Sequence, residues 1–501
     1  MKLKNKAFAL LTALFMCGTS SVYADTLDYG IFGGIIEGRS LPKTTELLLQ
    51  GSSSGTDKLE STYKEVIFLS GVPTEFEGNI TTTNSAMKDS MGTFKTTYTI
   101  TPSDSTSEDA SISRKLTYDV NYRTEGNQTV KDYTVSSWSE TISVNGEDFV
   151  LDSNQSRSSI SVLEDSTPGV DYYKGDISHR AVYVNGENKV TLDISGSIYG
   201  YDCAWSATES QRLNCIIDTG DWQMEYQIRP AVTMYKTIDY SKNEPTAISF
   251  DGNYQEIMQN KSGLNYTIYT LPVQFSLDVA TTGSASIASF NTFEQLIAPK
   301  VEHLEGHFAE GDIKKLFAME ILDGVPEYYL PNQAISRGQF TEMLVKTIKL
   351  PIVDMNAKKS SFDVIFEDVV PNEDELYPYI MAAYQSGLVM GRGDGKYYLT
   401  DAITREEAIV ILLRTLGLEH LGLSTTYLTS FVDSDNISDW AKKEVFAAQK
   451  IGIITGDQDG KFNPKDYITK AEAAAIVNRL IDYMRSDLQS SYTESIINYA
   501  D

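Results

Sequence analysis

Polar and apolar positions alternate along the first half of the chain, from about residue 25 to residue 283. Runs such as GTFKTTYTIT from Gly92, RKLTYDVNY from Arg114 and YTIYTLPVQFSLDV from Tyr266 place apolar or aromatic residues at every second position. Successive side chains of a strand point to opposite faces, so this period of two predicts strands with one buried face.

Turn signals between these runs agree with strands. Asn145-Gly146 and Asn185-Gly186 stand between alternating segments, and Asp251-Gly252 follows the same pattern. Such pairs tolerate the positive φ angles of tight hairpin turns. Residues 25–283 are therefore predicted to form an antiparallel, all-β, sandwich-like region, as one large or two small sandwiches.

The pattern changes after Gly283. Ile313, Leu316 and Phe317 have the spacing of one helix face, and the Thr-rich alternation is lost. This change predicts a linker at 284–300 followed by a helical region.

The helical region contains three copies of one unit. Segments starting at Phe366 and Phe431 align at an offset of 65 residues, and a more divergent copy precedes them. Each copy reads as a helix, a Gly-containing turn, a loop and a second helix. The predicted units are 301–351, 362–421 and 428–485, followed by a tail at 486–501. Repeats of this length favour modules that stack on one another.

The start of the second helix is clearly marked in each copy. The sequences ISRGQF, ITREEA and ITKAEA each combine a capping Ser or Thr with Gln or Glu three residues later. These patterns predict capping boxes with a preceding Ile as a hydrophobic staple. The predicted pairs are Ser336 with Gln339, Thr404 with Glu407, and Thr469 with Glu472.

A basic residue follows each predicted cap: Arg337, Arg405 and Lys470. The helix dipole disfavours a cation there by a few tenths of a kcal/mol or more. A cation repeated at this position indicates an anionic ligand, to which exposed helix N–H groups would also donate. The alternative is a surface cation paired with a nearby acid.

These copies resemble S-layer homology domains, which carry an I-T-R-A-E run after a G-x-x-D-G-x-[FY]-x-P loop. The stretch GDQDGKFNPKDYITKAEAA from Gly456 follows that pattern nearly throughout. The resemblance implies an all-α, pseudo-threefold unit that binds secondary cell-wall polysaccharide, often bearing acidic pyruvyl ketals. It also implies that Arg337, Arg405 and Lys470 contact this ligand in a groove of each copy.

The copies differ at positions that matter for binding. Copy one reads GVPEYYLP where the others carry Asp394 or Asp459 in an Asp-Gly loop, so its groove is expected to be shorter. Trp440 and Phe308 fill an aromatic position where copy two has Glu375. We therefore add Asp394, Asp459 and Trp440 to the candidate ligand residues and expect unequal sites, with copy two the most complete.

The first 24 residues have the features of a secretory signal peptide. A basic MKLKNK segment, a short apolar run and SVYA precede an expected cut between Ala24 and Asp25. Loss of Lys2, Lys4 and Lys6 changes the net charge from -27 to -30. So acidic a chain disfavours nucleic-acid and membrane-surface binding, and no later segment reads as a transmembrane helix.

Cys203 and Cys215 remain after the leader, and export predicts that they form a disulfide. Two free thiols are the alternative. No metal or cofactor is expected: the chain has four His, none close to these cysteines. The loop at Asp457 and Asp459 lacks the first carboxylate and the closing Glu of a calcium loop, since Thr455 stands at its start.

The β region carries no recognisable catalytic motif. Trp138, Trp205 and Trp222 could form a sugar-stacking platform but are more typical of core positions. We therefore predict a non-catalytic surface protein of a bacterium, secreted and held non-covalently on the cell wall, with a surface-layer, adhesion or envelope role and a capacity for self-association. The alternative is an anchored enzyme or carbohydrate-binding protein, in which two carboxylates would act on polysaccharide.

Overall fold

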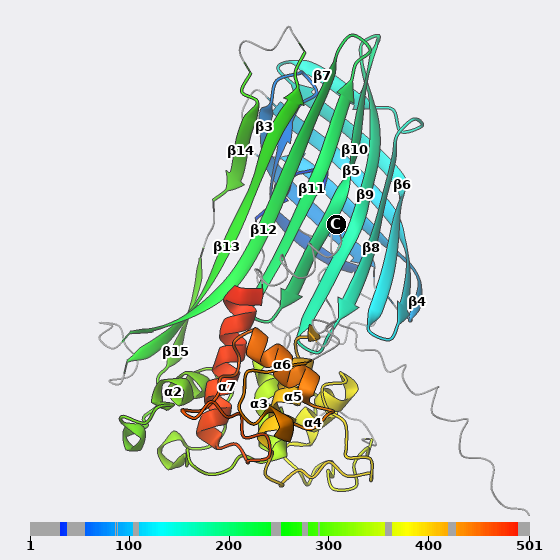
Figure 1. Cartoon of the computed structure of the whole chain (residues 1–501). Helices are drawn as coiled ribbons and strands as arrows, with labels where there is room; N and C mark the ends of the chain where they lie inside the picture. The colour runs from blue at the N-terminus through cyan, green and yellow to red at the C-terminus, as the bar shows by residue number, and fades with distance from the viewer. Residues whose placement is uncertain are drawn as a thin grey trace, which may run out of the picture.

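The computed structural model describes residues 31–37, 56–85, 87, 89–103, 110–241, 252–272, 279–288, 291–355, 363–418 and 427–488. The predicted leader and most of the predicted tail lie outside these residues. A β-rich part comes first in the chain, and a helical part packs against one end of it (Figure 1).

The β-rich part is one continuous antiparallel sheet. Its strands are β1 (Ile35–Ile36), β2 (Thr56–Ile67), β3 (Thr74–Ser85), β4 (Met91–Pro102), β5 (Ala110–Glu125), β6 (Gln128–Val144), β7 (Glu147–Leu151), β8 (Arg157–Ser166), β9 (Val170–Asn185), β10 (Asn188–Cys203), β11 (Ser206–Asp218), β12 (Gln223–Ser241), β13 (Asn253–Thr270), β14 (Thr282–Ile287) and β15 (Thr292–Ile297). Most strands pair with their neighbours in sequence, which makes a long meander.

The sheet curls on itself, so that β14 returns to contact β2 (Figure 1). The predicted alternation places one face of each strand inside: Leu116, Tyr118 and Val120 of β5 are fully buried, and the residues between them are more exposed. The expected sandwich is wrong in this respect, because hydrogen bonding continues through a single sheet and the core fills its concave side.

The sheet also extends further along the chain than predicted. Residues 284–300, predicted to be a linker, contain the end of β14 and all of β15, and both strands pair with β13. The TFEQLI run of β15 lacks a clear period of two and leaves much of its surface exposed, so periodicity could not reveal it.

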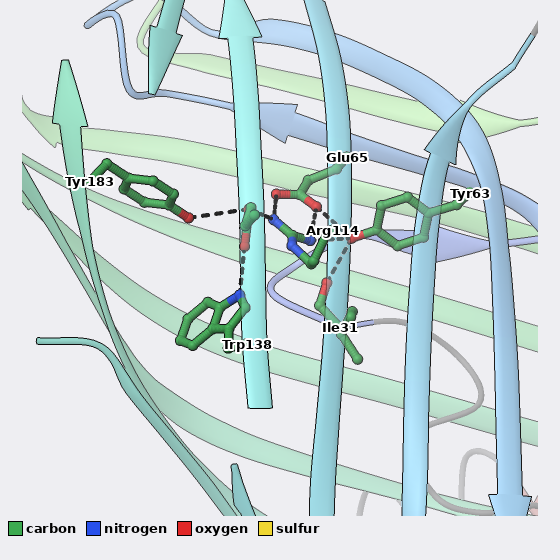
Figure 2. Close-up of polar contacts among 7 residues, drawn as sticks. Ile31, Tyr63, Glu65, Arg114, Trp138 and Tyr183 are labelled. Atoms are coloured by element: carbon green, nitrogen blue, oxygen red, sulfur yellow. Dashed lines mark hydrogen bonds and ion pairs between the residues drawn. The ribbon is translucent and has the colours of Figure 1, made fainter. Parts of the chain in front are cut away.

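An ionic cluster is buried inside the sheet (Figure 2). The guanidinium of Arg114 donates to Glu65 at 2.8 Å and to Glu140 at 2.6 Å. Trp138 Nε1 donates to Glu140 at 2.8 Å, and Tyr183 Oη donates to it at 3.2 Å. Burial alone would lower the pKa of Arg114, but the two carboxylates raise it above its usual value.

The described segment near the N-terminus lies inside the same curl. Residues 31–36 are all buried, and the ring of Phe32 stacks on Trp138 with centroids 5.2 Å apart. Arg114 lies 4.6 Å above that ring, and the Ile31 carbonyl accepts a hydrogen bond from Tyr63 at 2.9 Å. This segment therefore completes the packing around the buried charges.

The predicted disulfide is wrong. Both cysteines are free and buried. Cys215 pairs with Ile194 across β10 and β11, nine residues before Cys203, which corresponds to about 30 Å along a strand. A disulfide needs Cα atoms within about 7 Å. Burial raises the pKa of Cys203 to about 11 and that of Cys215 to about 12, so both side chains act as core thiols.

The helical part contains the three predicted helix pairs. They are α2 (Glu310–Ala318) with α3 (Arg337–Thr347), α4 (Tyr377–Gln385) with α5 (Arg405–Arg414), and α6 (Lys442–Lys450) with α7 (Lys470–Asp482). Short 3₁₀ turns lie at Glu302–Leu304, Pro326–Tyr328 and Ser434–Asn436, and a π-helical turn at Tyr483–Asp487 follows α7.

The three repeats close into a ring. The second helix of each repeat packs on the first helix of the next: α3 on α4, α5 on α6, and α7 on α2. Bridges between Ala334 and Thr469, Ser336 and Ala402, and Thr404 and Tyr467 join the segments before the three second helices. This cyclic pattern is the pseudo-threefold arrangement that the resemblance implied.

The sheet docks on the C-terminal ends of the second helices. Trp205, only 2% exposed, donates to the Thr347 carbonyl at the end of α3 at 2.8 Å. Tyr172 Oη donates to the Leu416 carbonyl at 2.9 Å, just after α5, and Ser206 donates to the Met484 carbonyl after α7. Helix ends leave carbonyls without helical partners, and here the β part supplies donors for all three.

Candidate functional site

All three predicted capping boxes are confirmed. Ser336, Thr404 and Thr469 each accept a hydrogen bond from the backbone N–H three residues later, and the Gln or Glu side chain at that position accepts one from the backbone N–H of the cap. Their three helices begin at the end of the ring opposite the docked sheet (Figure 1). The caps therefore fix Arg337, Arg405 and Lys470 as the first residues of α3, α5 and α7.

The helix N–H groups are not free to bind a ligand as the sequence suggested. The N–H of Arg337 donates to the Asp401 carbonyl at 2.8 Å, and that of Arg405 to the Asp466 carbonyl at 2.9 Å. The N–H of Lys470 donates to the Gln333 carbonyl at 2.8 Å. Each acceptor belongs to the loop of the neighbouring repeat, so these amides join the repeats, and recognition of an anion falls to the side chains.

Arg337 is buried between repeats one and two. Its guanidinium lies 4.9 Å above the ring of Tyr397, donates to the Met390 carbonyl at 3.2 Å, and lies 3.8 Å from the carboxylate of Glu407. Arg392 also donates to Glu407, at 2.9 Å. Although burial raises the pKa of Glu407, the Thr404 backbone N–H and the two guanidiniums hold it below its usual value.

Arg405 repeats this arrangement between repeats two and three. Its guanidinium lies 5.5 Å above the ring of Phe462 and 3.2 Å from the carboxylate of Glu472. Burial lowers the pKa of Arg405, although Glu472 opposes that shift. In both junctions a capping-box glutamate of one repeat therefore neutralises the cation of the previous repeat.

Lys470 differs from the two arginines. Its ammonium lies 5.7 Å from the ring of Tyr329, in repeat one. The capping-box position that would supply the acid is Gln339, which is neutral. Within the residues that the structure describes, no carboxylate lies within 4 Å of the Lys470 ammonium. Lys470 is therefore the cation of the three whose charge is not compensated by a neighbouring repeat.

The pairing of loops with cations also differs from our expectation. The short loop of copy one, around Tyr329, faces Lys470 of copy three, whereas Arg337 of copy one faces the Asp-Gly loop of copy two. The sequence alignment assigned each loop to the cation of its own copy. The ring closes between copies, so the shortened loop affects Lys470.

The remaining predicted site residues lie on the surface near these junctions. Asp394 accepts hydrogen bonds from the Tyr398 hydroxyl and the Lys396 N–H, and Asp459 is exposed, its N–H donating to Asp457 at 2.9 Å. Both carboxylates belong to loop turns. Trp440 is 54% exposed and lies two residues after Ser438, which donates to Glu406 beside Arg405.

Several residues that shape the junctions escaped sequence reasoning. Asp368 accepts from the N–H groups of Tyr397 and Tyr398, and Asp433 binds the equivalent loop in repeat three. His303 holds the Tyr329 carbonyl in repeat one at 2.8 Å. These three positions share the 65-residue offset, and the conserved loop aromatic includes Tyr397 and Phe462, so a stricter comparison of the copies could have found them.

Two further searches concern metals and membranes. Across the described ranges, no group of three or more His, Cys, Asp or Glu side chains is placed to hold a metal ion. Within the same part of the chain, no helix has the length and apolar content needed to cross a membrane.

A ring of three capped helix pairs, each contributing one cation at a junction, defines a modular binding unit. The family model for the S-layer homology domain matches residues 303–341, 365–409 and 430–474. The chain therefore carries three S-layer homology domains, which lie inside the three predicted units.

Named relatives include both enzymes and surface-layer proteins. The chain is 35% identical over 187 residues to an exoglucanase, XynX, of Acetivibrio thermocellus, covering 36% of this chain and 16% of that protein. It is 33% identical over 187 residues to an amylopullulanase of Thermoanaerobacterium thermosulfurigenes, covering 36% and 9%. It is 27% identical over 194 residues to the S-layer protein EA1 of Bacillus anthracis, covering 38% and 21%.

The chain thus spans well under two thirds of the length of these relatives. What they share with it is consistent with the family match. S-layer homology domains bind cell-wall polysaccharide, and their presence identifies a secreted protein of the bacterial cell surface.

Proposed function

We propose that this protein is held on the cell wall by an acidic secondary polysaccharide bound at the three repeat junctions, and that it displays a non-catalytic β region. The observation that carries this proposal is the set of three cations at the starts of α3, α5 and α7, each stacked on an aromatic ring of the next repeat. A cation beside an aromatic ring suits a sugar that carries a carboxylate, because the ring packs against the sugar and the cation pairs with the acid.

Charge decides how the three junctions contribute. Glu407 and Glu472 already offset Arg337 and Arg405, so an incoming anion gains less there. Lys470 has no such offset and supplies a full charge. We therefore assign the acidic group of the polymer to the Lys470 junction and assign mainly sugar packing to the other two. An acidic ligand that bears a pyruvyl ketal fits this assignment.

The direction of display follows from the two ends of the ring. The helix starts that carry the cations lie opposite the sheet, which covers the helix ends (Figure 1). A polymer bound at the cations therefore leaves the sheet pointing away from the wall. This geometry suits a surface-layer, adhesion or envelope role, in which copies of the sheet can associate with one another.

Two observations support a non-catalytic β region over an anchored enzyme. The close carboxylates of Glu65 and Glu140 share one guanidinium in the interior, where the cavity beside them has a volume of only about 20 Å³. Trp138 and Trp205 are buried, so neither offers a sugar platform. The alternative of a polysaccharide-active enzyme is motivated by the exoglucanase and amylopullulanase among the relatives.

We expect Lys470→Ala in the full chain to weaken binding to purified sacculi by about tenfold, since a charge-assisted pair is worth about 1.5 kcal/mol or more. The melting temperature should not change, because the lysine has no carboxylate partner among the described residues to leave unpaired. Co-sedimentation at several protein concentrations measures the affinity.

Lys450→Ala is the matched control, since it removes the same charge from an exposed position at the end of α6. It should bind as the unmodified chain does. Equal loss in both variants would mean that net charge alone governs binding, and no loss in Lys470→Ala would place the acidic sugar elsewhere.

A further inference from the structure

An open cleft of about 470 Å³ lies in repeat one, away from the three cations. Its apolar walls are formed by Pro299, Phe317, Pro326 and Tyr379, and its polar lining includes Glu320, Asp323 and Lys346. That volume falls within the range of small-molecule sites, about 300–1,000 Å³. The proposed wall-binding function does not use this cleft.

The acidic residues around the cleft are peculiar to repeat one. Glu320 directly follows the C-cap of α2, where repeats two and three have Gly387 and Gly452. Glu320 has a φ of 58°, a left-handed conformation that the two glycines also adopt and that glycine tolerates better. Repeat one therefore keeps a carboxylate at a position where the backbone favours glycine.

Two more acids follow the same rule. Asp323 aligns with Met390 and Thr455 of the other repeats. Glu342, the sixth residue after the cap of α3, aligns with Val410 and Ala475, counted from the caps of α5 and α7.

The charge balance of the cleft is negative. Lys346 pairs with Asp323 and lies 3.2 Å from Glu342, and its ammonium is 5.1 Å from the ring of Tyr379. Burial raises the pKa of Glu342 to about 8, and the neighbouring Asp323 adds to that shift. Lys346 thus offsets one of three acids, and Glu320 projects a further carboxylate at the cleft without a cation assigned to it.

We infer that this cleft binds an amine-bearing sugar, with the ring against Tyr379 and Phe317 and the ammonium between Asp323 and Glu320. Aromatic and proline walls suit the flat faces of a sugar, and the acidic lining favours a cation over a neutral or acidic group. The choice of a sugar as carrier of the amine rests on the proposed function, because that function places this end of the molecule against wall glycan.

The test uses the full chain and two probes that differ only at the nitrogen: a glucosamine tetramer and an N-acetylglucosamine tetramer, titrated by calorimetry at fixed ionic strength and pH 6.5. We expect the amine form to bind at least about tenfold more tightly, as a charge-assisted contact implies. Equal affinity for both probes, or no binding of either, would overturn the inference.

Variants locate the site. Glu320→Gly and Asp323→Asn should each weaken binding of the glucosamine tetramer by about fivefold or more, while the melting temperature of Glu320→Gly does not fall, because glycine suits the left-handed backbone. Asp394→Asn, on an exposed loop of another repeat, should bind this probe like the unmodified chain. Unchanged affinity in both cleft variants would contradict the assignment.

Sacculus binding of the same variants separates the two proposals. Retained sacculus binding with lost glucosamine binding leaves wall anchoring intact and confirms the cleft as an independent site. If the unmodified chain binds glucosamine but not sacculi, the proposed anchoring fails while the cleft assignment stands as an amine site.

Discussion

Replacing Arg114 by Leu is expected to lower the free energy of unfolding of the β part by about 3–5 kcal/mol, because it leaves buried carboxylates without their cation. Glu65 and Glu140 both contact this guanidinium, and their side chains are 9% and 0% exposed. Phe32 and the Ile31 carbonyl pack around the same cluster (Figure 2). Loss of the charge should therefore loosen the segment at residues 31–36 as well.

Arg123→Leu is the matched control. Arg123 pairs with Glu125 on the same strand, but both side chains are more than 60% exposed. Exposed pairs contribute about 0–1 kcal/mol. Guanidinium unfolding followed by the fluorescence of buried Trp138 measures both variants. Similar small losses in the two would show that the buried charges are not essential to the fold.

Trp205→Ala is expected to separate the unfolding of the two parts of the molecule. Trp205 packs in the core that the sheet shares with the helices, and its indole N–H satisfies the last carbonyl of α3. Truncating a buried Trp costs about 3–5 kcal/mol. We expect scanning calorimetry to show one transition for the unmodified chain and two for the variant, because parts with a weakened interface unfold independently.

The control is Trp440→Ala, which removes an indole of equal size from an exposed position. It should leave a single transition at nearly the same temperature. Two transitions already present in the unmodified chain, or one unchanged transition in Trp205→Ala, would contradict a rigid junction between the sheet and the helical ring.

Local patterns predicted the local structure well. The capping boxes at Ser336, Thr404 and Thr469 depend on residues three positions apart, so the sequence contains the whole motif. The strands of the β part follow from the period of two for the same reason. The predicted copies also contain the helix pairs that the structure forms.

Contacts that depend on strand register or ring closure were not predictable in the same way. The disulfide failed because the hairpin register separates Cys203 from Cys215 along the strands. The partner of Lys470 was misassigned because Tyr329 comes from the other end of the repeat array. Such contacts are set by how distant segments meet, which spacing along the chain does not encode.

The central claim is that an acidic wall polymer holds this protein on the cell surface. The most direct measurement is co-sedimentation of the full chain with sacculi that retain their secondary polymer and with sacculi from which it has been chemically removed. The account predicts saturable binding to the first and loss of binding to the second. Equal binding to both preparations would contradict it.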